Sequence, residues 1–236
     1  MQANHQSRII KGLLFDLDNT LYYYEPAHTA GLHAVFSALQ NKTNLSVNSL
    51  NTAYEQAKQH IKLRLHNTAA SHHRLLYFQT MLEQLNIFSL TQAYDLYNLY
   101  WSAFFAAMQP VPGMKDMLHK LASIYTLAIV TNFIADIQYR KLEQLGITTI
   151  IKYLVTSEEL GCEKPDAKVF LAACKKMQLR PDELCMIGDD LAADIIPAQH
   201  LGMETYWLTS QQENIKPEHS LFKTCSTFYE IEERLQ

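Results

Sequence analysis

The stretch LLFDLDNTLYYYE, residues 13–25, passes from an apolar run directly into Asp16 and Asp18, which stand two positions apart. An apolar run bounded by polar residues is typical of a buried strand. In an open parallel sheet, ligands bind outside the carboxyl ends of the strands. The stretch therefore predicts a strand that ends in two carboxylates at a ligand-binding edge.

Similar apolar runs recur along the chain, with helical segments between the later ones. The runs are RIIKGLLF, YTLAIVTN, IIKYLVTS, LCMIGDD and METYWLTS. The segments between them carry apolar residues at three- and four-residue spacing. They are GMKDMLHKLAS, ADIQYRKLEQLG, DAKVFLAACKKMQL and AADIIPAQHLG, and two of them end on glycine, which is typical of helix ends. The alternation predicts an α/β fold: a Rossmann-like parallel sheet core flanked by helices.

The segment between the first two runs is too long for one crossover connection. It contains almost no glycine and has the pattern of successive amphipathic helices. We therefore predict an inserted all-helical cap domain, residues 23–107, and an α/β core domain formed by residues 1–22 and 108–236. The last cap helix carries an aromatic stripe, which at helical spacing indicates a packed interior. Its members are Tyr97, Trp101, Phe104 and Phe105.

Composition excludes several classes of partner. The 236 residues are 48% hydrophobic, which is enough for a substantial core. The net charge of -4 gives no basic footprint, so we expect no nucleic acid polymer as a partner. The chain has no apolar run long enough to span a bilayer, and its N-terminus lacks the pattern of a secretory signal, so we expect a cytoplasmic protein without a membrane partner. The four cysteines form no CxxC pair, which favours free thiols over zinc ligands or disulfides. The oligomeric state is left open.

Polar residues stand at four predicted strand ends. They are Asp16 and Asp18 after the first run, Thr131 and Asn132 after the second, Lys164 in the loop after the third, and Asp189 after the fourth. Because the carboxyl ends of parallel strands meet at one edge of a sheet, we expect these groups to form one site.

Four segments resemble the motifs of a known superfamily, the haloacid dehalogenase-like hydrolases. They are DLDNT (16–20), VTN (130–132), EKPD (163–166) and GDDLAAD (188–194), in the expected order and after the expected strands. The position of the helical insert is similar to that of the helical cap in the first cap class of this superfamily. The resemblance covers the predicted core and implies a phosphatase with an aspartyl-phosphate intermediate.

The resemblance gives the two aspartates of the opening stretch different roles. A carboxylate can attack phosphorus and split one difficult hydrolysis into two easier steps, and Asp16 is the implied nucleophile. Asp18 is the implied general acid and base, which protonates the leaving alkoxide and later deprotonates the attacking water. The implied cofactor is Mg²⁺, bound by the side chains of Asp16 and Asp189 and by the backbone carbonyl of Asp18.

The remaining motif residues are implied to bind the phosphoryl group or to support the site. Thr131 and Asn132 would hold phosphoryl oxygens through hydroxyl and backbone N–H donors, and Lys164 would offset negative charge on the nucleophile and the phosphoryl group. Thr20 is expected to brace its own loop by a local hydrogen bond. Asp194 is expected to orient a metal-bound water or Lys164 from outside the ligand set.

Some residues keep two interpretations at this stage. Asp190 is either an acid in the first turn of a helix or an outer metal contact. Arg74 either meets an anionic substrate or is a solvated helix arginine. Tyr22, Tyr23 and Tyr24 follow the nucleophile, where the family carries a flap that joins core and cap. The cap histidines His66, His72 and His73 have a spacing that fits no metal motif.

The sequence favours a phosphatase acting on a small phosphomonoester, of the nucleoside monophosphate or sugar phosphate class. A 2-haloacid dehalogenase is the first alternative, but a departing halide needs no proton, and the family's dehalogenases lack an aspartate at the position of Asp18. A phosphomutase would keep all four motifs and would return the phosphoryl group to its substrate. A non-catalytic binding protein on this scaffold would be expected to have lost one of the catalytic residues, and all are present.

Overall fold

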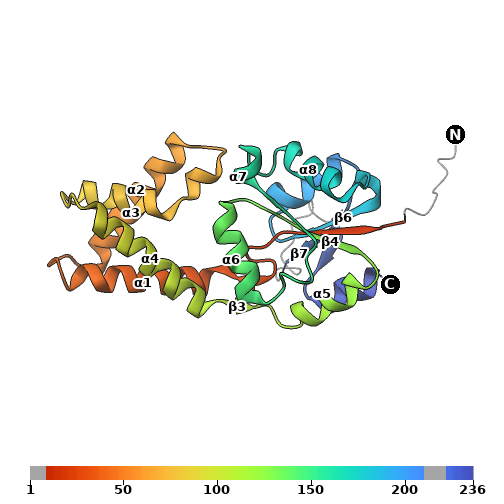
Figure 1. Cartoon of the computed structure of the whole chain (residues 1–236), viewed down its shortest axis with the longest axis horizontal. Helices are drawn as coiled ribbons and strands as arrows, with labels where there is room; N and C mark the ends of the chain where they lie inside the picture. Colours follow the sequence, from red (N-terminus) through yellow and green to blue (C-terminus); the bar gives the residue numbers. More distant parts are fainter. Residues whose placement is uncertain (1–8, 210–221, 236) are drawn as a thin grey trace.

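A parallel sheet forms the centre of one half of the molecule (Figure 1). The computed structural model describes residues 9–209 and 222–235. The strand order is β5-β4-β1-β6-β7-β8, and every neighbouring pair is parallel. The strands are β1 (Gly12–Phe15), β4 (Thr126–Thr131), β5 (Tyr153–Thr156), β6 (Leu184–Gly188), β7 (Glu204–Leu208) and β8 (Thr224–Cys225).

Helices cover both faces of this sheet, which explains why its central strands are apolar on both sides. Leu14 of β1 belongs to a buried cluster with α8 and α9, whereas Leu13 and Phe15 belong to a cluster with α5, α6 and α10. The helices of this half are α5 (Met114–Ala122), α6 (Ala135–Leu145), α7 (Ser157–Leu160), α8 (Ala167–Met177), α9 (Ile196–His200) and α10 (Phe228–Leu235), with the short helix η2 (Pro181–Glu183). The predicted α/β class with parallel strands is confirmed.

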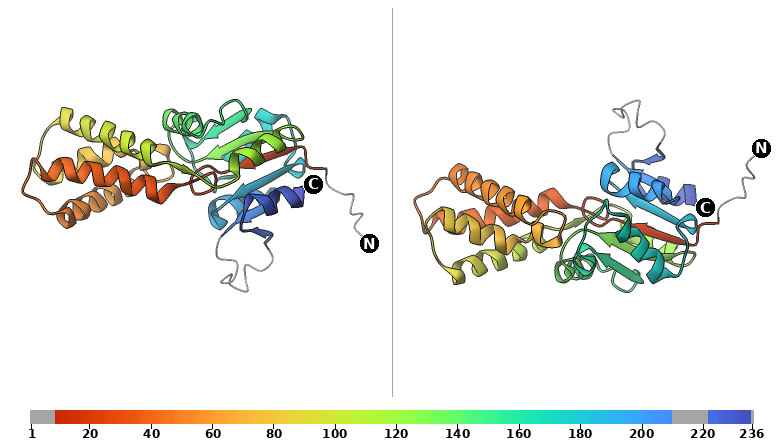
Figure 2. Two further views of the ribbon diagram at one scale, coloured as in Figure 1. Left: turned by 90° about the horizontal axis from the view of Figure 1, so that it is seen from below. Right: turned by 90° about the horizontal axis from the view of Figure 1, so that it is seen from above.

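Helices alone make up the other half of the molecule (Figures 1 and 2). They are α1 (Tyr24–Gln40), α2 (Val47–Arg64), η1 (Ala69–His72), α3 (Arg74–Gln84) and α4 (Leu90–Ala107). The chain enters and leaves this helical insertion through a two-stranded antiparallel ribbon, β2 (Tyr22–Tyr23) and β3 (Gln109–Pro110). The insertion is therefore joined to the sheet at the edge where the carboxyl end of β1 lies.

The aromatic stripe of α4 packs inside the helical insertion, as its spacing predicts. Trp101 and Phe104 are buried and lie 5.0 Å apart between ring centroids, and Tyr97 and Phe105 are partly buried against the same core. Aromatic pairs in this geometry add to the stability that burial itself provides. The aromatic residues thus hold the insertion together.

The structure differs from the sequence prediction in two elements. The segment AADIIPAQHLG is not one α-helix, because it begins as a π-helix, η3 (Leu191–Ile195), before α9. The strand β8 was not predicted, since two residues are too few to give a pattern. The domain limits stay a prediction. The described residues do not include parts of the predicted core, namely residues 1–8, 210–221 and 236, and the last residue of the run METYWLTS is among these.

The four cysteines are free thiols, and three of them are buried, as expected for small apolar core residues. Within residues 9–209 and 222–235, no helix is both long and apolar enough to cross a membrane.

Candidate active site

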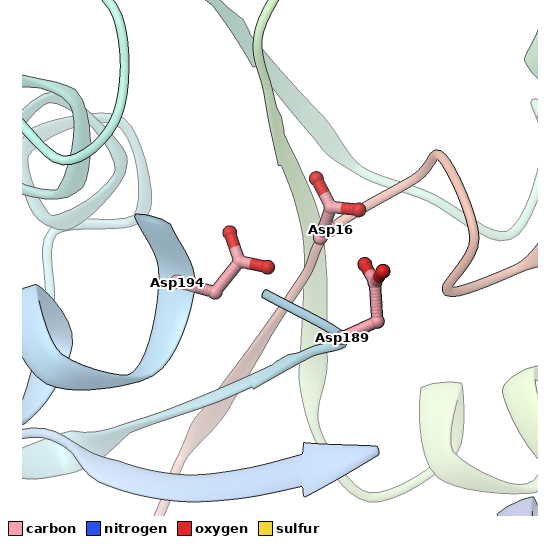
Figure 3. A group of neighbouring side chains, drawn as sticks. All are labelled: Asp16, Asp189 and Asp194. Carbon is pink, nitrogen blue, oxygen red and sulfur yellow. The ribbon is translucent and has the colours of Figure 1, made fainter. Parts of the chain in front are cut away.

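Three carboxylates converge at the carboxyl end of the sheet (Figure 3). Asp16 follows β1, Asp189 follows β6, and Asp194 lies in η3. One oxygen atom of each lies within 4.8 Å of the others. The strands β1 and β6 are parallel neighbours, so their ends bring Asp16 and Asp189 to the same edge. The fold thus assembles an acidic cluster from segments that lie far apart in the sequence.

The π-helix turns Asp194 toward this cluster. The backbone N–H groups of Ala192 and Ala193 donate to Asp190 Oδ1 at 2.8 and 2.9 Å, so Asp190 caps the helix. The structure thus shows Asp190 at the N-terminus of this helix, and an outer metal contact stays a prediction. Glycine at position 188 leaves space for the Asp194 side chain, because a Cβ atom on residue 188 would lie 2.4 Å from Asp194 Oδ2. π-Helical turns are rare and occur frequently at functional sites.

Lys164 lies between two of the carboxylates. Its ammonium nitrogen is 2.6 Å from Asp16 Oδ1 and 2.6 Å from Asp194 Oδ1, and it donates to the carbonyl of Val130 at 2.9 Å. Asn132 fixes the backbone of this lysine, because its Oδ1 accepts from the Lys164 N–H at 2.8 Å and its Nδ2 donates to the Lys164 carbonyl at 3.2 Å. Lys164 is therefore held rigidly beside the predicted nucleophile.

The acidic cluster carries more negative charge than its surroundings neutralise. Burial raises the pKa of Asp16 well above its usual range, against the opposing effect of Lys164. Burial and the neighbouring charge of Asp194 raise the pKa of Asp189 to about 6. When all three carboxylates are ionised, one ammonium group leaves two negative charges unbalanced, and a bound cation would favour this ionised state. An oxygen-ligated divalent cation is the ligand that this donor set fits.

Asp18 lines the same pocket as the cluster but contacts a different cation. Its Oδ1 lies 2.6 Å from the ammonium nitrogen of Lys141 and accepts a short hydrogen bond from the hydroxyl of Tyr22. Burial alone would raise the pKa of Asp18, but Lys141 and the Tyr22 hydroxyl outweigh it and hold the pKa below its ordinary value. These two hydrogen-bond donors therefore orient the Asp18 side chain and favour its ionised form. The side chain of Asp18 is 31% exposed, whereas that of Lys141 is 2% exposed.

The other predicted residues surround the cluster. The hydroxyl of Thr131 accepts from Gln138 Nε2 at 2.6 Å. Thr20 was expected to brace its own loop, but its hydroxyl donates to Asp189 Oδ1 at 3.1 Å. This contact joins residues that are 169 positions apart, and it therefore could not be read from local sequence. Thr20 restrains the rotation of the Asp189 carboxylate.

Two adjoining cavities open onto Asp18, and each has a volume of about 200 Å³. The first, which we call the catalytic pocket, contains the predicted site residues Asp16, Asp18, Thr131, Asn132, Lys164, Asp189 and Asp194. The second, which we call the cap pocket, lies between core and helical insertion. Its walls are Asp18, Asn19, Tyr24, His72, Arg74, Trp101, Asn132, Phe133 and Lys141. A substrate with its reacting group in the catalytic pocket would extend into the cap pocket.

Residues 13–208 match the family described as "Haloacid dehalogenase-like hydrolase". The chain belongs to the haloacid dehalogenase-like hydrolases. It is 38% identical over 206 residues, 86% of each chain, to a protein of Halopiger xanaduensis named ribulose-1,5-bisphosphate 5-phosphatase. It is 31% identical over 205 residues, 84% of this chain and 83% of the other, to glyceraldehyde 3-phosphate phosphatase of Methanopyrus kandleri.

The fold of this family is also seen in solved structures. The protein YfnB of Bacillus subtilis, crystallised with bound magnesium, has a TM-score of 0.74 and 23% sequence identity. The alignment covers 96% of this chain and 99% of that one. At this identity the likeness concerns the fold.

Sequence reasoning missed Lys141, the buried lysine that contacts Asp18. The helix α6 buries Ile137, Leu142 and Leu145 on one face, and Lys141 lies among them at an apolar position. A lysine in the apolar stripe of an amphipathic helix is a signal that could have found it, because lysine is almost never fully buried without a partner. Its partner, Asp18, could not be found from this pattern.

The flap tyrosines separate into three environments. Tyr22 is buried and donates to Asp18, Tyr24 lines the cap pocket, and Tyr23 is 44% exposed. Trp101 is the member of the predicted aromatic stripe that reaches the cap pocket. Among the cap histidines, His72 lies 3.1 Å from Glu163 and joins the insertion to the core.

Proposed function

We propose that this protein is a Mg²⁺-dependent phosphatase of sugar phosphates that works through an aspartyl-phosphate intermediate on Asp16. The observation that carries the proposal is the placement of Asp16 in the acidic cluster, 2.6 Å from the ammonium group of Lys164, with Asp18 two residues further along. Two relatives named for ribulose-1,5-bisphosphate and glyceraldehyde 3-phosphate support the sugar phosphate class over nucleoside monophosphates.

In the first step, a carboxylate oxygen of Asp16 attacks phosphorus and the bond from phosphorus to the sugar oxygen breaks. Lys164, 2.6 Å from Asp16, keeps the nucleophile oriented and offsets the charge of the phosphoryl oxygens. Mg²⁺, bound by Asp16, Asp189 and the backbone carbonyl of Asp18, would reduce the repulsion between carboxylate and phosphate. Asn132 keeps Lys164 in place through its two backbone contacts.

Asp18 handles the proton in both steps. The charge of an approaching phosphate raises the pKa of a neighbouring carboxyl, which favours the protonated acid in the substrate complex. Asp18 then gives its proton to the departing sugar oxygen and afterwards takes one from the water that attacks the acyl phosphate. Asp18 lines both cavities, so it would lie next to the bond between phosphoryl group and sugar in a substrate that occupies both.

The alternative functions make different use of these residues. A dehalogenase releases a halide, which needs no proton. It would therefore not need a general acid that is oriented by Lys141 and Tyr22, as Asp18 is. A phosphomutase would return the phosphoryl group to the sugar and release little phosphate. A binding protein would not need a lysine held between two carboxylates.

The test is the release of inorganic phosphate from ribulose 1,5-bisphosphate, glyceraldehyde 3-phosphate and a nucleoside monophosphate, with Mg²⁺ and with a chelator. Asp16→Asn is the variant, and Asp95→Asn, an exposed change on α4, is the matched control. We expect metal-dependent release in wild type and control and none in Asp16→Asn. Release that persists in chelator, or in Asp16→Asn, contradicts the proposal.

A further inference from the structure

Arg74 is a buried cation in the wall of the cap pocket. It begins α3, is only 8% exposed, and lines the pocket together with Asp18. Its hydrogen bonds are all to uncharged oxygens, and its guanidinium carbon lies 5.3 to 5.7 Å from the ring centroids of Tyr77, Tyr100 and Phe133. Nη1 donates to the carbonyl of His72 at 2.5 Å, Nη2 donates to the hydroxyl of Tyr24, and Nε donates to the hydroxyl of Tyr100 at 3.4 Å.

Arg74 differs in this respect from the other buried cations. Lys164 lies within 2.6 Å of Asp16 and Asp194, and Lys141 lies within 2.6 Å of Asp18. In the part of the chain that the structure describes, no carboxylate lies within 4.0 Å of a nitrogen of Arg74. A buried charge without an opposite charge is costly, and a buried arginine is normally paired.

A carboxylate near the pocket residue His72 contacts that histidine and not Arg74. Glu163 lies 3.1 Å from His72, the residue whose carbonyl Arg74 contacts. The ring centroid of Phe133 lies near both cations of the pocket, 5.7 Å from the Arg74 guanidinium carbon and 5.6 Å from the Lys141 nitrogen. Since Lys141 is neutralised by Asp18, Arg74 supplies the unbalanced positive charge of the cap pocket.

We propose that Arg74 binds a second anionic group of the substrate, at the end of the sugar remote from the phosphoryl group that is cleaved. The substrate class is then a sugar phosphate or sugar acid phosphate with a second phosphate or a carboxylate. A planar guanidinium suits either group, because it donates parallel hydrogen bonds to two oxygens. This inference rests on the proposed function, since it assumes that the reacting phosphoryl group lies beside Asp16.

The cap pocket is suited to the body of such a substrate. It continues from Asp18, which faces the bond to be broken, to Arg74, and it has a volume of about 210 Å³. Tyr24, Trp101 and Phe133 supply rings along this path. Arg74 belongs to the helical insertion and Asp18 to the sheet, so a doubly anionic substrate would contact both halves of the protein at once.

The test compares substrates that differ in the second anion alone. One pair is ribulose 1,5-bisphosphate with ribulose 5-phosphate, and the other is 3-phosphoglycerate with glyceraldehyde 3-phosphate. The first pair tests a phosphate and the second a carboxylate. Both are assayed with Mg²⁺ on wild type, Arg74→Met, Arg74→Lys and the control Arg64→Met, which removes an exposed arginine of α2.

We expect wild type to favour the doubly anionic member of at least one pair in kcat/KM by about tenfold or more. Arg74→Met should reduce this ratio about tenfold to hundredfold, mainly through KM, because a charge-assisted hydrogen bond is lost. Arg74→Lys should restore part of the ratio, and Arg64→Met should leave it unchanged. Titration calorimetry of ribulose 1,5-bisphosphate with Asp16→Asn, with and without Arg74→Met, measures the same contact without turnover.

The outcomes separate the two proposals. Absence of phosphate release from every substrate contradicts the proposed function, whereas release without preference for the second anion overturns the Arg74 inference alone. An equal loss of kcat/KM for both members of a pair in Arg74→Met also overturns it, since a structural arginine would act on all substrates. Thermal unfolding shows whether Arg74→Met folds. If it does not, the substrate preference of wild type and its reduction in Arg74→Lys still test whether Arg74 binds the second anion.

Discussion

Replacing Lys141 by methionine tests how Asp18 is controlled. Methionine keeps most of the length and apolar volume of the lysine stem but removes the ammonium group that lies 2.6 Å from Asp18. That group is also within 5.8 Å of the ring centroids of Tyr22, Phe104 and Phe133, so the new side chain would contact apolar surface. The change therefore isolates the charge from the packing.

The loss of stability should be small for a buried ion pair. Breaking a fully buried pair costs about 3–5 kcal/mol because one charge remains unpaired. Asp18 is 31% exposed and keeps its hydrogen bond from Tyr22, so water and a hydroxyl replace part of the lost contact. We expect a fall of about 1–2 kcal/mol in the free energy of unfolding, or a few degrees in Tm for a chain of this size.

The effect on catalysis should depend on the leaving group. General acid catalysis contributes about 10²- to 10⁴-fold, and misplacing the acid loses part of this, so we expect kcat for a sugar phosphate to fall about tenfold to hundredfold. p-Nitrophenyl phosphate has a leaving group that departs without a proton and should lose much less. Lys175→Met, an exposed change on α8, is the matched control. Equal losses for both substrates, or no loss for either, would refute the role of Lys141 in positioning Asp18.

Three further perturbations follow from the structure. Gly188→Ala should displace Asp194, because the added Cβ would lie 2.4 Å from Asp194 Oδ2. We expect this change to lower kcat at least tenfold in the phosphate-release assay. The control Gly202→Ala should lower stability and leave kcat unchanged. Adding Mg²⁺ should raise Tm in wild type, and Asp189→Asn should abolish that rise, as measured by calorimetry. Burial lowers the folded-state pKa of His28 from 6.5 to about 3. The free energy of unfolding should therefore be highest above pH 6.5 and should fall by about 1 kcal/mol for each pH unit below that value, because the unfolded chain binds the proton more tightly. His28→Gln should flatten this pH dependence in thermal unfolding between pH 7 and 5.

Local pattern was sufficient to predict five of the six strands of the sheet in the described residues, and the residues at its edge. The strand β1 is a short apolar run because helices cover it on both faces, and the same burial produces the runs of β4, β5, β6 and β7. The position of Asp16 and Asp189 at one edge followed from the parallel direction of neighbouring strands. These features depend on sequence neighbours and on topology, which a single sequence reveals.

Contacts between distant segments could not be predicted in the same way. The bond from Thr20 to Asp189 and the pairing of Lys141 with Asp18 depend on how α6 and the first loop pack against the sheet. The π-helix at Leu191–Ile195 has no residue pattern of its own, because one extra residue per turn is compatible with an ordinary helical stripe. The charge of Arg74 could be assigned to substrate or solvent only once its burial was known.

The central claim is that Asp16 carries the phosphoryl group during turnover. Acid quenching of wild type and Asp18→Asn during turnover of p-nitrophenyl phosphate with Mg²⁺, followed by proteolysis and mass spectrometry, measures this directly. We expect a phosphorylated peptide that contains Asp16, in greater amount in Asp18→Asn because the water that opens the acyl phosphate is no longer activated. Phosphoryl transfer to another residue, or turnover by wild type without phosphorylation of this peptide in either protein, would contradict the account.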